Sequence, residues 1–518
     1  MVEQEIELKL SLPEGEVARF RRDPMIHRLK QGRAVNKPLL AAYFDTPNLS
    51  LKSARMALRI RQEGRLRVQT LKIATKGSAT GIQVRGEFNA KTNRNSPDIA
   101  LIENEAARCA LLRAIGRTKD DNSTPESAIL NLIPVFTTDV RRTVWTLADG
   151  TDAVEVCLDL GTIESGGKSV MIREVELELK RGSEAFLLDI ADTFAERYGC
   201  RVFSDSKAAR GYGLFSPSTP TPRKAGKLRL EPDQSVWEAF QAIIGEGTDQ
   251  LFANEPAVRL GQDVEGVHQA RVAVRRMRAA LSAFRPVLPD AFRGPLNKDM
   301  RWVGNMLGPA RDWDVFIDET LDAVLKRPGR PPALDRFAAR CGEARKRGYR
   351  RARKGLNSAR YGRLQLSLIR VPYTAAPTLE AERPIGEFAG ALLDERLRAV
   401  QTAAGRDPSL LDEASLHALR IDIKKLRYAI EFFGNIYVAD YVKPYRSALR
   451  RLQECLGGLN DAAVHTAMLQ AMNAPDRPVS KSVQRAILSH LHASRDEGLS
   501  HLTEMWGAFS TLPPFWRS

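Results

Sequence analysis

Polar and apolar residues alternate along several short segments in the first 212 residues of the chain. The segments 5–10 and 174–180 place a charged residue at every second position, with an apolar residue between each pair. Because successive side chains on a β-strand point to opposite faces, each segment predicts a strand with one charged and one apolar face. Residues 57–61, 66–72 and 154–160 also read as strands, and helical periodicity is present around 103–115 and 184–198. This pattern predicts an α+β domain of antiparallel strands and a few helices over residues 1–212.

The rest of the chain has a different pattern. Residues 213–230 are rich in proline, which predicts a linker without helix or central strand. From residue 231 to 518 the periodicity is helical, and one set of polar residues occurs twice, 149 positions apart. This repeat predicts an all-α domain of two related helical bundles. The residues His268, Arg271, Arg275, Arg276 and Arg278 recur as His417, Arg420, Lys424, Lys425 and Arg427.

The repeated basic residues are spaced as on one side of a helix. Offsets of 0, 3, 7 and 10 residues lie within about 80° of one another on an α-helix, and the residue at offset 8 extends the stripe on one side. Like charges at these spacings destabilise an isolated helix. A solvated face is one interpretation, but its duplication favours a binding site for a polyanion.

Charge and composition narrow the partners and the compartment. The net charge is +16; residues 1–212 carry 33 Lys and Arg against 29 Asp and Glu, and residues 213–518 carry 46 against 34. The basic excess indicates nucleic acid, a membrane surface or a phosphate polymer as partner. The sequence has no run of about 18 apolar residues and no apolar targeting segment, so we expect no membrane span. Five separated cysteines without CxxC spacing favour a reducing compartment, and we expect a cytoplasmic protein.

The charged faces of the predicted strands suggest chemistry on phosphates. If the strands close into a barrel with these faces inward, acids and bases share one lumen, which is unstable unless every charge is matched. A triphosphate with one or two divalent cations meets this requirement, because Arg and Lys bind phosphoryl oxygens and carboxylates bind Mg²⁺ or Mn²⁺. The residues expected on this face include Arg59, Arg61, Lys72, Arg85, Glu87, Arg141, Asp159 and Lys207.

Several of these motifs together resemble the CYTH family of triphosphate tunnel metalloenzymes. Glu5-x-Glu7-x-Lys9 matches the family's ExExK motif, and supporting matches follow in the family's order up to about residue 212. They are Tyr43-Phe44-Asp45-Thr46, Leu58-Arg59-Ile60-Arg61, Thr70-Leu71-Lys72, Arg85-x-Glu87, Leu158-Asp159-Leu160-Gly161, the strand with Glu174, Glu176 and Glu178, and Ser206-Lys207.

The resemblance implies a barrel-like tunnel and a role for each matching residue. It implies that Glu5, Glu7, Asp159, Glu174, Glu176 and Glu178 are ligands of Mg²⁺ or Mn²⁺. It also implies that Lys9, Arg59, Arg61, Lys72, Arg141 and Lys207 form a catalytic phosphate clamp, with Arg85 and Glu87 as further substrate-binding residues. The chain departs from the family at Asn89, where an acid is common, so Glu87 is either a metal ligand or the partner of an arginine.

The second half resembles the CHAD family of helical domains across roughly residues 231–510. His268 and His417 with their basic stripes carry this resemblance, which implies binding of inorganic polyphosphate. The combination is similar to bacterial inorganic triphosphatases of CYTH–CHAD type and implies hydrolysis of inorganic triphosphate to diphosphate and phosphate.

Other functions remain open at the sequence level. Within the same fold, the substrate could be thiamine triphosphate or a nucleoside triphosphate, and cyclase chemistry on ATP is a further alternative. A protein that binds polyphosphate or nucleic acid without turnover is the alternative from another class. Nucleic acid is disfavoured, because the stripe 268–278 contains no aromatic residue and Tyr428 alone lies beside the second stripe.

Overall fold

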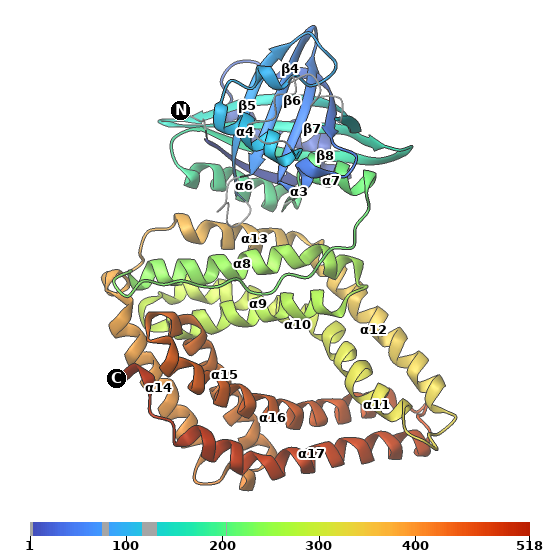
Figure 1. Cartoon of the computed structure of the whole chain (residues 1–518), viewed down its shortest axis with the longest axis vertical. Helices are drawn as coiled ribbons and strands as arrows, with labels where there is room; N and C mark the ends of the chain where they lie inside the picture. The colour runs from blue at the N-terminus through green and yellow to red at the C-terminus, as the bar shows by residue number, and fades with distance from the viewer. Residues whose placement is uncertain (1–3, 75–81, 117–131, 204, 518) are drawn as a thin grey trace. The chain divides into compact units, whose positions relative to one another are not determined.

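Two units of different secondary structure make up the chain in this computed structural model (Figure 1). The structure describes residues 4–74, 82–116, 132–203 and 205–517, and within these the side chains of residues 4, 5, 74 and 83–85 are not described. The first unit consists of residues 1–220 and 357–373, and the second of residues 221–356 and 374–518. No helix in the described ranges is long and apolar enough to cross a membrane.

The first unit is built on an antiparallel sheet that closes on itself. The strand order is β5-β4-β3-β2-β6-β7-β8-β1-β9, and β1 pairs with β5 as well as with β8 and β9, which completes a barrel. This confirms the predicted barrel. The strands are β1 (Gln4–Ser11), β2 (Val35–Asp45), β3 (Met56–Glu63), β4 (Leu66–Ala74), β5 (Ile82–Thr92), β6 (Ile133–Asp149), β7 (Asp152–Ser165), β8 (Lys168–Arg181) and β9 (Arg201–Val202).

The hydrophobic core of this unit lies mainly outside the barrel. The apolar faces of β1 and β8 carry buried leucines and valines such as Leu8 and Leu177, and α6 packs on β7 and β8. Burying these residues outside the barrel turns the charged residues of the same strands inward. The helices are α1 (Val17–Phe20), α2 (Pro24–Leu29), α3 (Ser50–Ser53), α4 (Glu105–Ala114), α6 (Glu184–Tyr198) and α7 (Lys207–Phe215).

One helix of this unit comes from much later in the chain. Helix α13 (Ala359–Arg370) packs against α6 and β9. The Gln365 side chain accepts a hydrogen bond from the backbone N–H of Val202 at 3.1 Å and donates one to its carbonyl at 3.4 Å. The Gln365 side-chain amide therefore satisfies both backbone groups of Val202, as the backbone of a neighbouring strand would.

The second unit consists of two helical bundles with the same helix order. Residues 216–235 connect it to α7 without helix or strand. Helices α8, α9 and α10 begin at Val236, Val264 and Asp290. Helices α14, α15 and α16 each begin 149 residues after the corresponding position. The helices are α8 (Val236–Leu260), α9 (Val264–Ala283), α10 (Asp290–Val315), α11 (Asp322–Leu325), α12 (Leu334–Leu356), α14 (Ile385–Ala404), α15 (Glu413–Phe433), α16 (Ala439–Met472) and α17 (Lys481–Ser510).

Each bundle packs its helices in chain order. In the first bundle α8 packs on α9, α9 on α10 and α10 on α12; in the second, α14 packs on α15, α15 on α16 and α16 on α17 (Figure 1). A contact between α9 and α15 joins the two bundles. The duplicated basic helices therefore lie next to each other.

Candidate active site

The interior of the barrel holds a cavity of about 300 Å³ with mostly charged walls. Its lining comes from inward-facing positions of the strands and from α7. A charged interior of this kind is stable only where opposite charges match. The basic residues around it are Lys9, Lys37, Arg59, Arg61, Lys72, Arg142 and Lys207, and the acidic residues are Glu7, Glu63, Glu87, Glu155, Asp159, Glu176 and Glu178.

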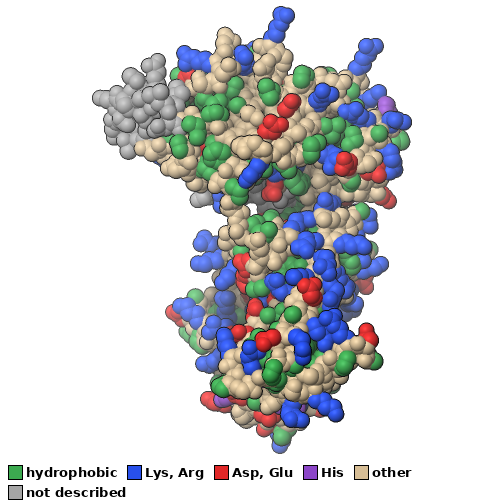
Figure 2. All heavy atoms as spheres, turned by 90° about the vertical axis from the view of Figure 1, so that its right-hand side faces the viewer, with side chains coloured by type: hydrophobic (Ala, Val, Ile, Leu, Met, Phe, Trp, Pro, Cys, Tyr) green, Lys and Arg blue, Asp and Glu red, His purple; other side chains and the backbone are tan. Residues whose placement is uncertain are grey.

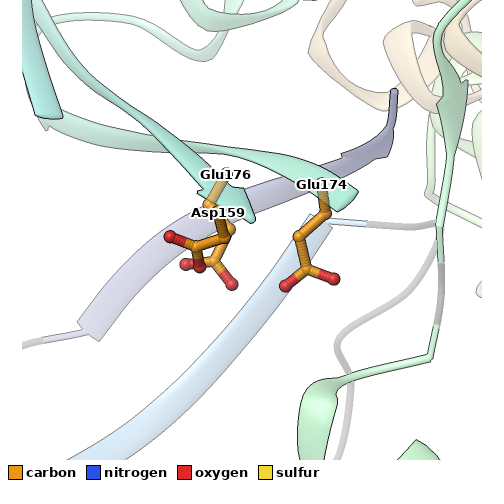
Figure 3. Close-up of side chains that lie close together, drawn as sticks. All are labelled: Asp159, Glu174 and Glu176. Carbon is orange, nitrogen blue, oxygen red and sulfur yellow. The ribbon is translucent and has the colours of Figure 1, made fainter. Parts of the chain in front are cut away.

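Three buried carboxylates from β7 and β8 lie at one wall. Asp159, Glu174 and Glu176 are 0%, 2% and 7% exposed, and each offers an oxygen within 4.8 Å of the others (Figure 3). Four cations surround them: the Lys207 ammonium lies 2.6 Å from Asp159 and 2.9 Å from Glu176, Lys9 lies 2.8 Å from Glu176, and Arg142 and Arg210 also form ion pairs with the group. This cluster is thus neutralised by the protein itself.

These cations keep Asp159 and Glu176 ionised. Burial alone would raise the pKa of Glu176, but Lys207, Lys9 and Arg142 overcome this and hold its pKa well below the usual range. Burial likewise opposes the charge of Lys207, yet Asp159, Glu176 and Glu174 raise its pKa well above the usual value. The wall is therefore a set of fixed charges over a wide pH range.

A second group of carboxylates forms a row across three neighbouring strands. Glu155 of β7 lies opposite Glu178 of β8, and Glu178 lies opposite Glu7 of β1. Like charges at directly opposed positions repel each other. Lys9 lies 3.2 Å from Glu7, and Lys180 lies 2.5 Å from Glu178. Lys9 is shared with Glu176 and Lys180 is largely exposed, so the row retains a surplus of negative charge at the cavity.

Both groups of carboxylates offer oxygen ligands for a divalent cation, and they differ in how far the protein's own cations already match their charge. Carboxylate oxygens are the ligands that Mg²⁺ and Mn²⁺ prefer, and a cation between the opposed glutamates would remove their repulsion. The cluster with Asp159 already has ammonium and guanidinium groups at its oxygens. Of the predicted metal ligands, Glu7 and Glu178 line the cavity beside Glu155, whereas the described carboxylates whose oxygens all lie within 4.8 Å of one another are Asp159, Glu174 and Glu176.

The opposite wall is basic. Arg59 donates a hydrogen bond to the Tyr43 hydroxyl at 3.3 Å, Arg61 lies 2.5 Å from Glu63, and Lys72 forms an ion pair with Glu87. The Nε atoms of Arg59 and Arg61 are buried without a hydrogen-bond partner among the described residues. Burial and the charge of Arg59 lower the pKa of Arg61. An anion in the cavity would satisfy these donors and relieve this repulsion.

Arg142, and not the predicted Arg141, faces the interior. Arg141 is exposed, whereas Arg142 lies opposite Asp159 and donates to both of its oxygens at 2.7 and 2.6 Å. The prediction chose the wrong member of an Arg-Arg pair, since neighbouring residues on a strand point to opposite faces. Glu155 was missed as well, although alternation along β7 places it on the same face as Asp159.

Lys207 reaches the barrel because α7 lies very close to β6. A Cβ atom on Gly211 would be 2.2 Å from the ring of Phe136, so only glycine permits this approach. Glu174 pairs with Lys207 and Arg210 and does not line the cavity. The side chains of the predicted residues Glu5 and Arg85 lie outside the described part of the structure.

In the helical unit, the two predicted basic stripes converge. Arg275 of α9 lies close enough to Arg420 and Lys424 of α15 to lower the pKa of both. Burial, followed by Arg420 and Arg275, lowers the pKa of Lys424 to about 7. The Nε atoms of Arg275, Arg420 and Arg427 are buried without a hydrogen-bond partner in the described residues. We call Arg271, Arg275, Arg420, Lys424 and Arg427 the cation cluster.

Basic side chains are also widespread on the face of the molecule in Figure 2, but most of those lie in solvent. The cation cluster differs because its groups are partly buried and repel one another. Its acidic neighbours are Glu431, 3.5 Å from Arg427, Asp312, 3.9 Å from Arg271, and Asp461, which partly offsets the repulsion at Lys424. Such an arrangement is stabilised by a bound polyanion.

Some stripe residues have other roles. Arg276 is 3% exposed and bridges Glu246 of α8 and Glu431 of α15, the latter at 2.7 Å, so its predicted place in the polyanion site is wrong. At offset 8 from His268 it lies about 160° around the helix from Arg278, on the side of the core. Lys425 pairs with Asp422 at 2.8 Å.

The remaining predicted members flank the cation cluster. Arg278 donates a hydrogen bond to Asn297 at 3.3 Å and lies near Arg301. His268 is half-buried, and burial together with Arg311 lowers its pKa. His417 is exposed, with Nδ1 at 3.1 Å from the side-chain oxygen of Asn460.

Both halves of the chain match known protein families. Residues 3–212 match the CYTH domain profile and residues 242–470 match the CHAD domain profile. An inorganic triphosphatase of Haemophilus influenzae is 35% identical over 175 residues, which is 34% of this chain and less than half, 45%, of that protein. An uncharacterized protein of Mycobacterium tuberculosis is 26% identical over 465 residues, 86% of this chain and 85% of that protein. The solved CHAD domain of the plant Ricinus communis is 31% identical, covers 57% of this chain and 98% of its own, and has a TM-score of 0.49.

Proposed function

Because the chain joins a CYTH domain to a CHAD domain, we propose that its barrel hydrolyses inorganic triphosphate to diphosphate and phosphate with a divalent cation. The observation that carries the proposal is the division of the barrel interior into a basic and an acidic wall. Similarity to a protein named as an inorganic triphosphatase supports the same reaction class.

In this proposal the basic wall holds the substrate. Arg59, Arg61 and Lys72 bind phosphoryl oxygens and take up the negative charge that develops as the terminal group leaves. Arg142 is fixed by Asp159 and presents a further guanidinium group from the other side. The donors are positioned before substrate arrives, so little reorganisation is needed during the reaction.

Glu7, Glu155 and Glu178 would hold Mg²⁺ or Mn²⁺, with Glu176 at the edge of the site. A bound cation would neutralise phosphate oxygens and lower the pKa of a bound water. Lys9 and Lys207 hold Glu176 beside this site in one arrangement and keep it ionised.

The lining favours inorganic triphosphate over an organic one. Tyr43 is the aromatic residue among the side chains that line the cavity, and its hydroxyl is engaged by Arg59. A thiazole, pyrimidine or adenine ring therefore finds little apolar surface in the described part of the barrel. Thiamine triphosphate and ATP remain the comparison substrates.

Phosphate release from inorganic triphosphate, ATP and thiamine triphosphate, with and without Mg²⁺ or Mn²⁺, tests this proposal. We expect metal-dependent release that is fastest from inorganic triphosphate. The double substitution Glu7→Gln with Glu178→Gln should abolish it while the protein stays folded, and Glu14→Gln at an exposed position is the control. Release at an unchanged rate in the double variant would contradict the assignment of the metal site.

We further propose that the cation cluster binds inorganic polyphosphate. A flexible polyanion with charges at every unit can satisfy cations on two helices, because it needs no fixed sequence of contacts. Replacing Arg271, Arg275, Arg420 and Lys424 by Gln should weaken polyphosphate binding and its salt dependence, and leave triphosphate hydrolysis intact. Lys443→Gln, at an exposed position on α16, is the matched control. Equal affinity for polyphosphate and for RNA of the same charge would contradict the proposal.

A further inference from the structure

The second helical bundle contains a cavity that the proposed functions do not use. It lies between α15, α16 and α17 and has a volume of about 660 Å³, more than twice that of the barrel cavity. Leu416, Leu456 and Leu491 form a buried apolar wall. Its volume and apolar lining are typical of small-molecule sites.

Two residues that line this space differ in size between the two copies of the repeat. The cavity residues Ala462 and Thr466 correspond, at the 149-residue offset, to Trp313 and Ile317 of the first bundle. Trp313 is packed edge to face against Phe316, with ring centroids 5.5 Å apart. The second copy thus has small side chains where the first has large ones, and the pocket beside Trp313 is smaller, about 460 Å³. Lining residues such as Glu413, His417 and Arg495 are exposed, so the space opens to solvent and a ligand can enter it.

The mouth of the cavity is polar and mostly basic. His417, Arg420, His492 and Arg495 line it, with Glu413 as an acidic neighbour. Arg420 donates a hydrogen bond to the Asn460 side-chain oxygen at 3.0 Å. Arg420 is also a member of the cation cluster, so the cavity adjoins Arg275, Lys424 and Arg427 through one shared residue.

We propose that this cavity binds the base and sugar of a nucleoside polyphosphate, whose phosphates lie along the cation cluster. The inference rests on the proposed binding of polyphosphate by that cluster. It adds a site for the nucleoside that is attached to one end of the phosphate chain. Several cations in succession match a series of phosphates, whereas a fatty acid would present one carboxylate. The Asn460 amide is already hydrogen-bonded to Arg420 and Asp461, and the Thr466 hydroxyl donates to the Ala462 carbonyl. The exposed His417 ring and the remaining lone pairs of the Thr466 hydroxyl can still accept or donate to a base, which an alkyl chain cannot do.

The test compares ATP, adenosine and inorganic triphosphate by calorimetry without divalent cations. The full-length chain carries Arg59→Ala and Arg61→Ala, so that binding in the barrel is suppressed. We expect ATP to bind at least about tenfold more tightly than inorganic triphosphate. Filling the cavity with Ala463→Leu and Thr466→Ile, the second being the residue of the first bundle, should remove this difference and leave triphosphate affinity unchanged.

A photoreactive azido-ATP provides a readout that does not depend on the filled variant folding. We expect the labelled peptides to come from α15, α16 or α17. Equal affinity for ATP and triphosphate, labelling confined to the barrel, or preference for an alkyl phosphate over ATP would each overturn the inference. If triphosphate and ATP both bind equally and both depend on Arg275 and Lys424, the polyphosphate site stands and the nucleoside site fails. If neither binds, both proposals fail.

Discussion

At the scale of single residues, the barrel is organised by which side chain of each strand faces inward. Arg142 and Arg141 are chemically identical neighbours, yet Arg142 lies against a fully buried carboxylate and Arg141 lies in solvent. The difference comes from the alternation of side chains and from the register of β6 with β7. The role of an arginine in this site therefore depends on its strand position.

We predict that Arg142→Ala destabilises the protein by about 3–5 kcal/mol, because Asp159 loses its guanidinium partner inside the barrel. Triphosphate hydrolysis should fall by about 10²-fold or more, since a fixed donor at the cavity is lost. Arg141→Ala is the control and should be close to the parent protein in both respects. Denaturant unfolding and steady-state phosphate release measure the two effects. Similar losses in both variants would contradict the assignment of Arg142 to the interior.

Lys424 provides a second prediction at this scale. Its pKa is lowered to about 7 by burial, Arg420 and Arg275, so the side chain is mostly neutral at pH 8. A bound polyanion favours the charged form, so binding at pH 8 should take up about one proton and affinity should fall as pH rises above 7. Calorimetry in buffers of different ionisation enthalpy measures the uptake. Lys424→Arg stays charged and should bind without it; unchanged uptake in this variant would contradict the prediction.

The same residue links pH to folding. In the unfolded chain Lys424 returns to its ordinary pKa of 10.5, so between about pH 7 and 10.5 the unfolded state binds the additional proton. The contribution of this group to the free energy of unfolding therefore rises with pH in that window.

At the scale of elements, α7 determines whether the buried charge network of the barrel is complete. It supplies Lys207, and its approach to β6 depends on Gly211 against Phe136. The sequence motif Ser206-Lys207 indicated the residue. The close contact that positions Lys207 is made by Gly211, four residues later on the same side of the helix.

We predict that Gly211→Ala destabilises the protein by about 1–3 kcal/mol, because a Cβ atom 2.2 Å from Phe136 must displace α7 or the ring. Lys207 should move from its carboxylate partners, and triphosphate hydrolysis should fall. Gly213→Ala on the same helix has no atom within 4 Å of its new Cβ and should be neutral or slightly stabilising. Thermal unfolding and activity of the two variants provide the comparison. A loss in Gly213→Ala as large as in Gly211→Ala would point to helix propensity instead of packing.

At the scale of the whole molecule, the boundary between the two units does not follow the order of the chain. Residues 357–373 lie between helices of the second unit in sequence but belong to the first by contact. The Gln365 side chain pairs with the backbone of Val202 on β9, next to β1. Cutting the chain at the proline-rich connection would therefore remove a helix from the barrel unit.

If the two units bind separate ligands, each should unfold in its own transition in scanning calorimetry. We predict that Mg²⁺ at 100 times its Kd raises the free energy of unfolding of the barrel unit by about 2.7 kcal/mol. The unfolding temperature of the helical unit should not change. Short-chain polyphosphate without metal should stabilise the helical unit. The double variant Glu7→Gln with Glu178→Gln should lose the response to Mg²⁺ and keep the response to polyphosphate. A shift of both transitions by Mg²⁺ would contradict the division of ligands between the units.

The features that could be read from sequence are those set by local periodicity. Alternation at Glu5–Leu10 and Glu174–Lys180 predicted strands with charged inner faces, because the pattern repeats every two residues within one strand. The 149-residue offset predicted two related bundles, because the same residues recur at the same spacing in both copies. The family resemblance, carried by ordered motifs, predicted the tunnel and the proposed polyanion site. All of these depend only on spacing along the chain.

What could not be read from sequence depends on contacts between distant segments. Strand register selects Arg142 over Arg141 and places Glu155 beside Glu178, and the packing of α9 on α15 buries Arg276 while bringing Arg275 to Lys424. The membership of α13 in the barrel unit and the open space beside Ala462 are likewise products of tertiary packing. Periodicity indicates which face of an element is polar, but only the neighbour that packs on that face decides which charges meet.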